Sequence, residues 1–359
     1  MSAALAEPCA AASAPSPLVS FDLASTIERL GDAWPRSLVT PSARTAAASF
    51  ARGLPPVFQW LVLESRLTSE APERVDLLAC LIDDGQTRTR LSHALDADDL
   101  HPGIAHAPLL ERWCRSPRAL AGAKVLWCEW DAPFARAQPL QLIGIDPRFW
   151  CPRRGARPEP GEQTGIAAAG YDATFGVAHD PPTLALIEAA IASLPPTGSA
   201  LFTASLRPRG KDVDRLFVEL PREAVLPWLE ANRWLGDRGD ARRWLYDVIA
   251  PWEPAYIQVE VAAGGLNAHL GIEPRQTSGA RSERRERRAF LTRLVASGRA
   301  RADRVEALLT WEGTSRVALG GVTLREVRTF HLKQVSQLGE APEVKAYLGV
   351  HYRPAITSS

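Results

Sequence analysis

The sequence predicts an α+β fold in which about five ββαα units build a ten-stranded antiparallel barrel surrounded by helices. Strand-like segments occur in pairs, and between the pairs the apolar period lengthens from two to about 3.6 residues. Each pair also has one apolar face and one polar face. Ten antiparallel strands in sequence are enough to close a sheet on itself and remove its edges.

The strand-like segments show the period of two that is typical of half-buried strands. They are expected at 57–66 with 73–84, 124–132 with 140–146, 201–208 with 214–220, 256–262 with 266–273, and as a hairpin over 330–354.

Segments whose apolar residues recur with helical spacing lie before and between these pairs. Helices are expected at 21–34 and 41–52, along Leu184, Ile187, Ile191 and Leu194, along Val225, Trp228, Leu229 and Asn232, and at 240–252, 282–297 and 302–311. The stretch 148–180 is rich in Pro and Gly in its first half and is expected to be a loop.

The two faces of each pair point in different directions. In the last hairpin, Phe330, Leu332, Ala346, Leu348 and Val350 share one face, and His331, Lys333, Lys345, Tyr347 and His351 share the other. In the third pair, Phe202, Ala204 and Leu206 are expected on the apolar face and Thr203, Ser205 and Arg207 on the polar one. The helices must bury the apolar faces. The polar faces then line a lumen or, in the alternative of an open sheet with helices on one side, face water.

Composition limits the class of protein. The 359 residues carry a formal net charge of +1, and no apolar run approaches the roughly 20 residues of a membrane span, so neither nucleic acid nor a membrane is an expected partner. The basic run RSERRERR at 281–288 is interleaved with Glu, as on a solvated helix face.

Five cysteines without a C-x-x-C pair favour a reducing cytoplasm. A single domain over 21–354 is expected between a disordered tail, 1–20, and a short tail, 355–359.

Lysine is rare in this chain and is concentrated in the last hairpin. Of the 42 basic residues, four are Lys (Lys124, Lys211, Lys333, Lys345) and 38 are Arg. A solvated lysine in so arginine-rich a chain is easily replaced by Arg, so the two lysines of one polar face are candidates for anion binding.

On this topology, and on the K-x-Y triplet Lys345-Ala346-Tyr347, the sequence resembles the ABBA, or PT-barrel, prenyltransferases over residues 21 to 354. Those proteins have about five α-β-β-α units, with ten antiparallel strands inside a ring of helices. In the indole-type members, K-x-Y triplets on barrel strands hold the prenyl diphosphate. The resemblance implies a prenyltransferase that moves an allylic group from its diphosphate to an aromatic or peptide acceptor.

The resemblance assigns roles to particular residues. Lys345, Tyr347, Lys333 and Arg207 are the candidates for binding diphosphate, with Arg215 in reserve, because preorganised cations stabilise the leaving group as its charge develops. Tyr256, Phe217 and Trp127 are the candidate aromatic wall that shields the allylic cation from water. Glu129, Glu260 and Glu64 are candidates for the carboxylate that accepts a proton or a hydrogen bond from the acceptor.

Some features depart from the family pattern. Its members carry more than one K-x-Y triplet, whereas the matching places here hold Ser205 and Arg207 in one pair and Gln258 and Glu260 in another. These departures keep open an alternative, a non-catalytic binding or accessory protein on the same scaffold. Three histidines lie on predicted strands: His269, His331 and His351. None has a Cys or a carboxylate at metal-ligand spacing, so no metal site is expected. No cofactor is required by the chemistry, and Mg²⁺ assistance is left open.

Overall fold

The computed structural model describes residues 18–68, 74–96, 101, 104, 108–115, 120, 122–134, 139–145, 159–175, 181–250, 254–274 and 281–355. Most of the two predicted tails lies outside the described residues. Strands are β1 (Trp60–Arg66), β2 (Asp76–Ile82), β3 (Val125–Trp130), β4 (Leu140–Gly144), β5 (Ser199–Ser205), β6 (Asp214–Glu219), β7 (Pro254–Ala262), β8 (Gly265–Pro274), β9 (Gly313–Leu319), β10 (Val322–Ser336) and β11 (Glu343–Pro354).

The helices follow the strand pairs along the chain. They are α1 (Leu23–Leu30), α2 (Pro41–Ala51), α3 (Thr87–Leu95), α5 (Pro108–Arg115), α6 (Pro160–Phe175), α7 (Pro181–Ala192), α8 (Arg222–Ala231), α9 (Arg238–Arg243), α10 (Arg281–Ala296) and α11 (Ala302–Trp311). Helix starts carry ordinary caps: the Asp22 side chain accepts from the Ser25 N–H before α1, and Thr40 accepts from the Ala43 N–H before α2.

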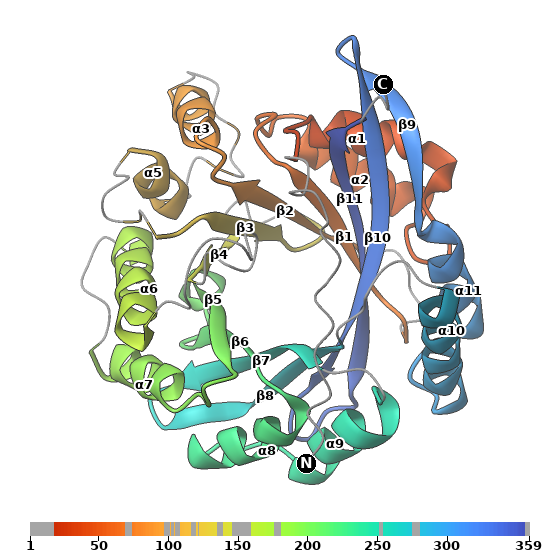
Figure 1. The fold of residues 1–359 in the computed structure, drawn as a ribbon. Coiled ribbons are helices and arrows are strands. Elements are labelled where there is room, and N and C mark those ends of the chain that lie inside the picture. The colour runs from red at the N-terminus through yellow and green to blue at the C-terminus, as the bar shows by residue number, and fades with distance from the viewer. Residues whose placement is uncertain are drawn as a thin grey trace, which may run out of the picture.

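The sheet closes into a ten-stranded antiparallel barrel. The strand order of the sheet is β11-β1-β2-β3-β4-β5-β6-β7-β8-β10-β9. Strand β11 also pairs with β10, so the ten strands other than β9 form the closed ring. Figure 1 shows the helices arranged around the outside of this barrel. The predicted barrel is therefore confirmed, and the open sheet is not formed.

The apolar strand faces point outward and are covered by the helices. Leu61, Leu63, Leu348 and Val350 are completely buried in one continuous core with helix residues such as Leu291. Each buried leucine contributes about 1.5–3 kcal/mol to stability by leaving water. The faces predicted for the last hairpin are those observed.

Helix α6 occupies a region predicted as a loop. Its first turn contains Pro160 and Gly161, which read as turn residues, although Pro is well tolerated at the first helical position. Gly170 lies farther along the same helix, where a Cβ would stand 2.9 Å from the Ile143 Cδ1 atom of β4. Glycine here permits close packing of the helix on the barrel, so the glycines that suggested a loop are compatible with a helix.

The polar and apolar faces predicted for β5 are reversed. Phe202, Ala204 and Leu206 belong to an apolar cluster on the inner side of the barrel, whereas the Thr203 hydroxyl contacts that of Tyr171 on the outer helix α6. The register of β5 with β6 shifts between Ala200 and Phe202. A bulge of this kind turns every later side chain to the other face.

The eleventh strand, β9, was not predicted. It pairs with the first half of β10, from Leu319 opposite Val322 to Gly313 opposite Arg328. Its side chains are mostly exposed, so it lacks the alternation that marks a half-buried strand. The β9–β10 hairpin rises beyond the other strands at the top of Figure 1.

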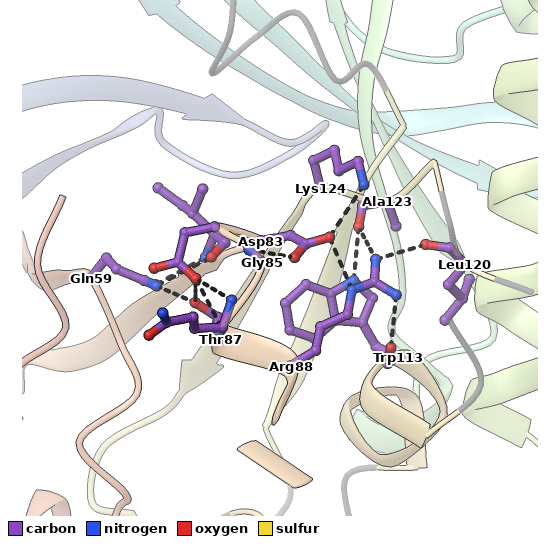
Figure 2. A network of polar contacts seen from close by, with 12 residues as sticks. Gln59, Asp83, Gly85, Thr87, Arg88, Trp113, Leu120, Ala123 and Lys124 are labelled. Atoms are coloured by element: carbon purple, nitrogen blue, oxygen red, sulfur yellow. Dashed lines mark hydrogen bonds and ion pairs between the residues drawn. The ribbon is translucent and has the colours of Figure 1, made fainter. Parts of the chain in front are cut away.

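A network around Arg88 fastens α3 and α5 to the barrel (Figure 2). The Arg88 guanidinium donates to the carbonyls of Trp113 at 2.9 Å, Leu120 at 3.1 Å and Ala123 at 3.0 Å, and its Nε lies 3.0 Å from the Asp83 carboxylate. It also stacks over the Trp113 ring at 4.5 Å. One side chain thus satisfies carbonyls at the end of α5 and in the connection to β3.

Candidate functional site

Strands β1, β10 and β11 place a cluster of charged side chains on the inner face of the barrel. Glu64 lies opposite Tyr347, Lys333 lies opposite Lys345, and His331 lies opposite Tyr347. Because alternate residues of a strand share a face, these residues all point to the interior. The two lysines of the last hairpin are therefore neighbours inside a closed barrel.

Lys345 contacts a buried carboxylate. Its Nζ lies 2.7 Å from Glu64 Oε1, and Arg66 Nη2 lies 3.2 Å from the same oxygen and 2.8 Å from Asp76 Oδ2. Burial alone would raise the pKa of Glu64, but the cations of Lys345, Arg66 and Lys333 outweigh it and hold that pKa well below its usual range. Glu64 is therefore a permanent carboxylate, suited to accepting a hydrogen bond and weak as a base.

Lys333 lies deeper against aromatic rings. Its Nζ donates to Gln258 Oε1 at 2.8 Å and lies 3.4 Å from Glu273 Oε1. It also lies 5.1 Å from the Tyr347 ring centroid and 5.5 Å from that of Phe217. Burial lowers the pKa of Lys333, and the carboxylate of Glu273 opposes part of that effect. Cation–π contacts of this kind favour the charged ammonium.

Tyr347 forms the centre of this wall. Its ring stacks on His331 with centroids 4.5 Å apart and ring planes within 1° of parallel. Burial raises the pKa of its phenol far above the usual value, and the nearby carboxylate of Glu64 adds to the effect. The phenol is consequently neutral and available as a hydrogen-bond donor.

A second ionic group surrounds Glu260 on β7. Arg215 approaches Glu260 Oε1 at 3.4 Å, Asn267 donates to Oε2 at 3.1 Å, and His269 Nδ1 lies 3.7 Å from Oε1. Burial lowers the pKa of His269 to about 4, more than the Glu260 charge raises it. His269 is therefore neutral at pH 7, with its Nε2 2.9 Å from Gln258 Nε2.

Glu129 on β3 belongs to a third group. Its carboxylate lies 3.1 Å from Arg209, which also contacts Asp131 at 3.2 Å. Burial favours a raised pKa for Glu129, but Arg209 overcomes it and the pKa is lowered. This carboxylate is thus committed to a salt bridge.

The other side of the interior is apolar and aromatic. It is lined mainly by strands β2 to β6, with one residue each from β1 and β7. Its residues, including partly buried ones at the edge, are Cys80, Val125, Leu140, Leu142, Phe202, Ala204, Phe217, Trp60, Trp127 and Tyr256. Phe202 and Phe217 meet edge to face at 6.2 Å. One part of the barrel interior is therefore lined by charged side chains, and another part by apolar and aromatic side chains.

Most predicted site residues face this interior, with one exception. Lys345, Tyr347, Lys333 and Glu64 form one group, and Phe217 contacts it. Arg207 instead belongs to the 3₁₀ turn Arg207–Arg209 after β5, where its Nε lies 3.0 Å from Asp212. The chain leaves the strand at Ser205, so the alternation that placed Arg207 on a polar face does not extend to it.

Some residues of the cluster were not predicted as site residues. Arg66 follows Glu64 by two positions on the same strand face, which is a signal that the sequence does carry. Glu273 lies on β8, and its contact with Lys333 depends on the pairing of β8 with β10. That pairing spans two helices and β9, and alternation within single strands does not reveal it.

Comparisons with known proteins yield structural neighbours only. No protein-family model and no curated protein sequence matches the chain. The apo form of the prenyltransferase PriB is similar with a TM-score of 0.46 and 14% identity, over 93% of this chain and 98% of PriB. PriB in ternary complex with L-tryptophan and dimethylallyl thiolodiphosphate is similar at 12% identity, with the same TM-score and coverage. AnaPT from Neosartorya fischeri has a TM-score of 0.42 and 11% identity, over 83% of this chain and 78% of AnaPT.

Two absences hold for the described part of the chain. None of its helices combines the length and the apolar character that crossing a membrane requires. Within the same residues, no three His, Cys, Asp or Glu side chains are grouped so that they could bind a metal ion.

Proposed function

We propose that the chain is a prenyltransferase that moves an allylic prenyl group from its diphosphate to an aromatic or peptide acceptor. The observation that carries the proposal is the arrangement of Lys333 and Lys345 on paired strands of a closed barrel, facing inward with the Tyr347 and Phe217 rings. Cations for a leaving diphosphate and aromatic rings for an allylic cation are the two requirements of this reaction.

The proposed reaction uses these residues in fixed roles. The allylic C–O bond breaks, its electron pair goes to the diphosphate oxygen, and the ammonium groups of Lys345 and Lys333 stabilise the new charge. The acceptor atom then donates an electron pair to the allylic carbon and loses a proton to the released diphosphate. Glu64 accepts a hydrogen bond from the acceptor and orients it, because its depressed pKa makes it a weak proton acceptor.

The aromatic wall protects the cation from water. Tyr347 and Phe217 lie within 5.5 Å of the Lys333 ammonium, so both rings already face a cation in this interior, and a positively charged carbon would use contacts of the same kind. Trp127 and Tyr256 extend the wall over the apolar side. Exclusion of water favours transfer to the acceptor over hydrolysis.

The ion pairs within the barrel favour a second candidate function. Lys345, Lys333, Arg215, Arg209 and Arg66 each contact a carboxylate. A diphosphate must compete with Glu64 and Glu273 for the two lysines, whereas an uncharged ligand need not. A non-catalytic binding or accessory protein on this scaffold would need no free cation.

Product formation separates the two functions. The purified protein is incubated with dimethylallyl or geranyl diphosphate and with tryptophan, tyrosine or short peptides containing them, and mass spectrometry detects the prenyl adduct. Parallel reactions contain Mg²⁺ or EDTA, since we propose that no metal is required. We expect an adduct with the wild type and a loss of about 100-fold or more in Lys345→Met, the magnitude of one transition-state contact.

The matched control is Lys124→Met. Lys124 is also a lysine in contact with a carboxylate, Asp83 at 3.2 Å, but its side chain is 41% exposed outside the cluster. It should retain wild-type activity. The absence of any adduct, together with no thermal stabilisation by dimethylallyl thiolodiphosphate, would reject the prenyltransferase in favour of the accessory protein.

A further inference from the structure

Three arginines lie side by side on three adjacent strands. Arg316 of β9 is directly opposite Arg325 of β10, and Arg325 is directly opposite Arg353 of β11. Side chains directly opposite each other are separated by about 5 Å at Cβ, so the three arginines leave the sheet from a row of roughly 10 Å. We call this set the rim row.

The rim row is on the interior side of the strands, at one mouth of the barrel. Glu326 and Tyr352, the chain neighbours of Arg325 and Arg353, contact each other on the outer face, so the arginines point the opposite way. Strand β1 begins at Trp60, opposite His351, and Arg353 therefore lies beyond its first residue. The hairpin that carries Arg316 and Arg325 is the one projecting at the top of Figure 1.

No carboxylate among the described residues pairs with the rim row. Within the described part of the chain, Arg316, Arg325 and Arg353 form no ion pair, whereas the interior lysines all do. Like charges directly opposite each other destabilise a sheet. The row is thus a concentration of positive charge that the fold does not neutralise.

Among the described residues, buried nitrogen atoms of His351, beside the row, and of Arg353, within it, have no hydrogen-bond partner. His351 is only 3% exposed and neither of its ring nitrogens is bonded, and the Nε of half-buried Arg353 is likewise unbonded. Burial, followed by the charges of Arg353 and Arg325, lowers the pKa of His351 to about 3. Buried polar groups without partners are rare and are expected where a ligand supplies the missing bond.

We propose that the rim row, with His351, is an anion site that binds a diphosphate group at the barrel mouth. Arginine is suited to this because its planar fork binds phosphate oxygens in pairs. The choice of diphosphate over other polyanions rests on the proposed prenyl transfer, whose donor and product both carry it. The rim site is separate from Lys345, which lies eight residues away along β11, roughly 26 Å at the rise of a strand.

The test counts diphosphate sites by calorimetric titration. Inorganic pyrophosphate and dimethylallyl thiolodiphosphate are titrated into the full chain at low salt. The wild type should bind pyrophosphate at two sites, one lost in Lys345→Met and the other in the double variant Arg316→Gln/Arg325→Gln. Affinity at the rim should fall about tenfold or more, as expected for charge-assisted hydrogen bonds. The thiolodiphosphate arm shows whether the rim takes the donor or only the released product.

A matched variant controls for net charge. Arg36→Gln/Arg52→Gln removes two arginines whose side chains are 71% and 62% exposed and should leave both sites intact. Equal losses in both double variants, or an unchanged titration of Arg316→Gln/Arg325→Gln, would overturn the rim site. Tighter binding of a polyglutamate peptide than of pyrophosphate would overturn the diphosphate assignment. A failed interior site with an intact rim site would instead count against the proposed function.

A ligand-free measurement separates a binding role from a structural one. Removing one member of a like-charged row relieves repulsion, so Arg325→Gln should raise the melting temperature at low salt. The difference should shrink at high salt because exposed charges are screened. A lower melting temperature in Arg325→Gln would show that Arg325 is structural.

Discussion

Arg88 and Lys345 are both basic side chains held by carboxylates, but their surroundings differ. Arg88 is 12% exposed and gives three of its hydrogen bonds to backbone carbonyls, in a network outside the barrel (Figure 2). Lys345 is 19% exposed and contacts a side-chain carboxylate on a neighbouring strand. Burial and charge do not distinguish them.

The difference lies in the nature of the partner. Backbone carbonyls stay in place when a ligand arrives, so Arg88 has no spare capacity and fixes the chain. Glu64 can share Lys345 with an incoming anion and can itself accept a hydrogen bond. Cations that bind side chains around a common interior are therefore better candidates for function than cations that cap the backbone.

The largest expected effect is on the Arg88 network. Arg88→Met should destabilise the protein by about 3–5 kcal/mol, because three backbone carbonyls lose a charged donor and the Asp83 carboxylate keeps only the half-exposed Lys124. Chemical denaturation measures the change. Arg90→Met on the same helix is the control, since exposed Arg90 bonds only Gln86 among the described residues and should cost little. Equal effects of the two substitutions would show that the network is not structural.

The interior should make stability depend on pH through His269. The pKa of His269 is about 4 in the folded protein, against an ordinary value of 6.5. At pH values between the two, His269 binds a proton in the unfolded chain but not in the folded protein. Stability should therefore fall as pH falls from 6.5 to 4, by about 3 kcal/mol in total, and change little from this group outside that window. His269→Gln should flatten the curve there. An unchanged slope in the variant would mean that His269 is protonated in the folded protein.

Glu64 should make stability depend on pH in a more acidic range than His269 does. Its folded pKa lies well below the ordinary 4.5, so its stabilising effect is fully present above 4.5 and is lost as pH falls below that value. At pH 7, Glu64→Gln should lower the free energy of unfolding by about 2 kcal/mol. This loss is smaller than that of Arg88→Met because Arg66 remains paired with the Asp76 carboxylate. Denaturation at pH 7 and pH 3.5 measures both effects. A difference that does not narrow at pH 3.5 would contradict an ionised Glu64.

The comparison also explains what the sequence could predict. Lys333, Lys345 and Tyr347 were placed on the correct face because alternation along a regular strand fixes each side chain's face. The face of Phe202 was wrong because a bulge at Ala200 leaves no mark in the hydrophobic pattern. The contact of Lys333 with Glu273 and the Arg88 network depend on which segments meet in space. Single-strand patterns carry no such information.

The smallest expected effect compares two cations on one carboxylate. Asp83 contacts Arg88 at 3.0 Å and Lys124 at 3.2 Å, but the Lys124 side chain is 41% exposed. Lys124→Met should therefore cost less than about 1 kcal/mol, because an exposed pair gains little and Asp83 keeps Arg88. The double variant with Arg88→Met tests whether the effects add. If Lys124 compensates for the missing arginine, the double variant will lose more free energy of unfolding than the two single variants lose in total. Residues that share a partner are coupled in this way.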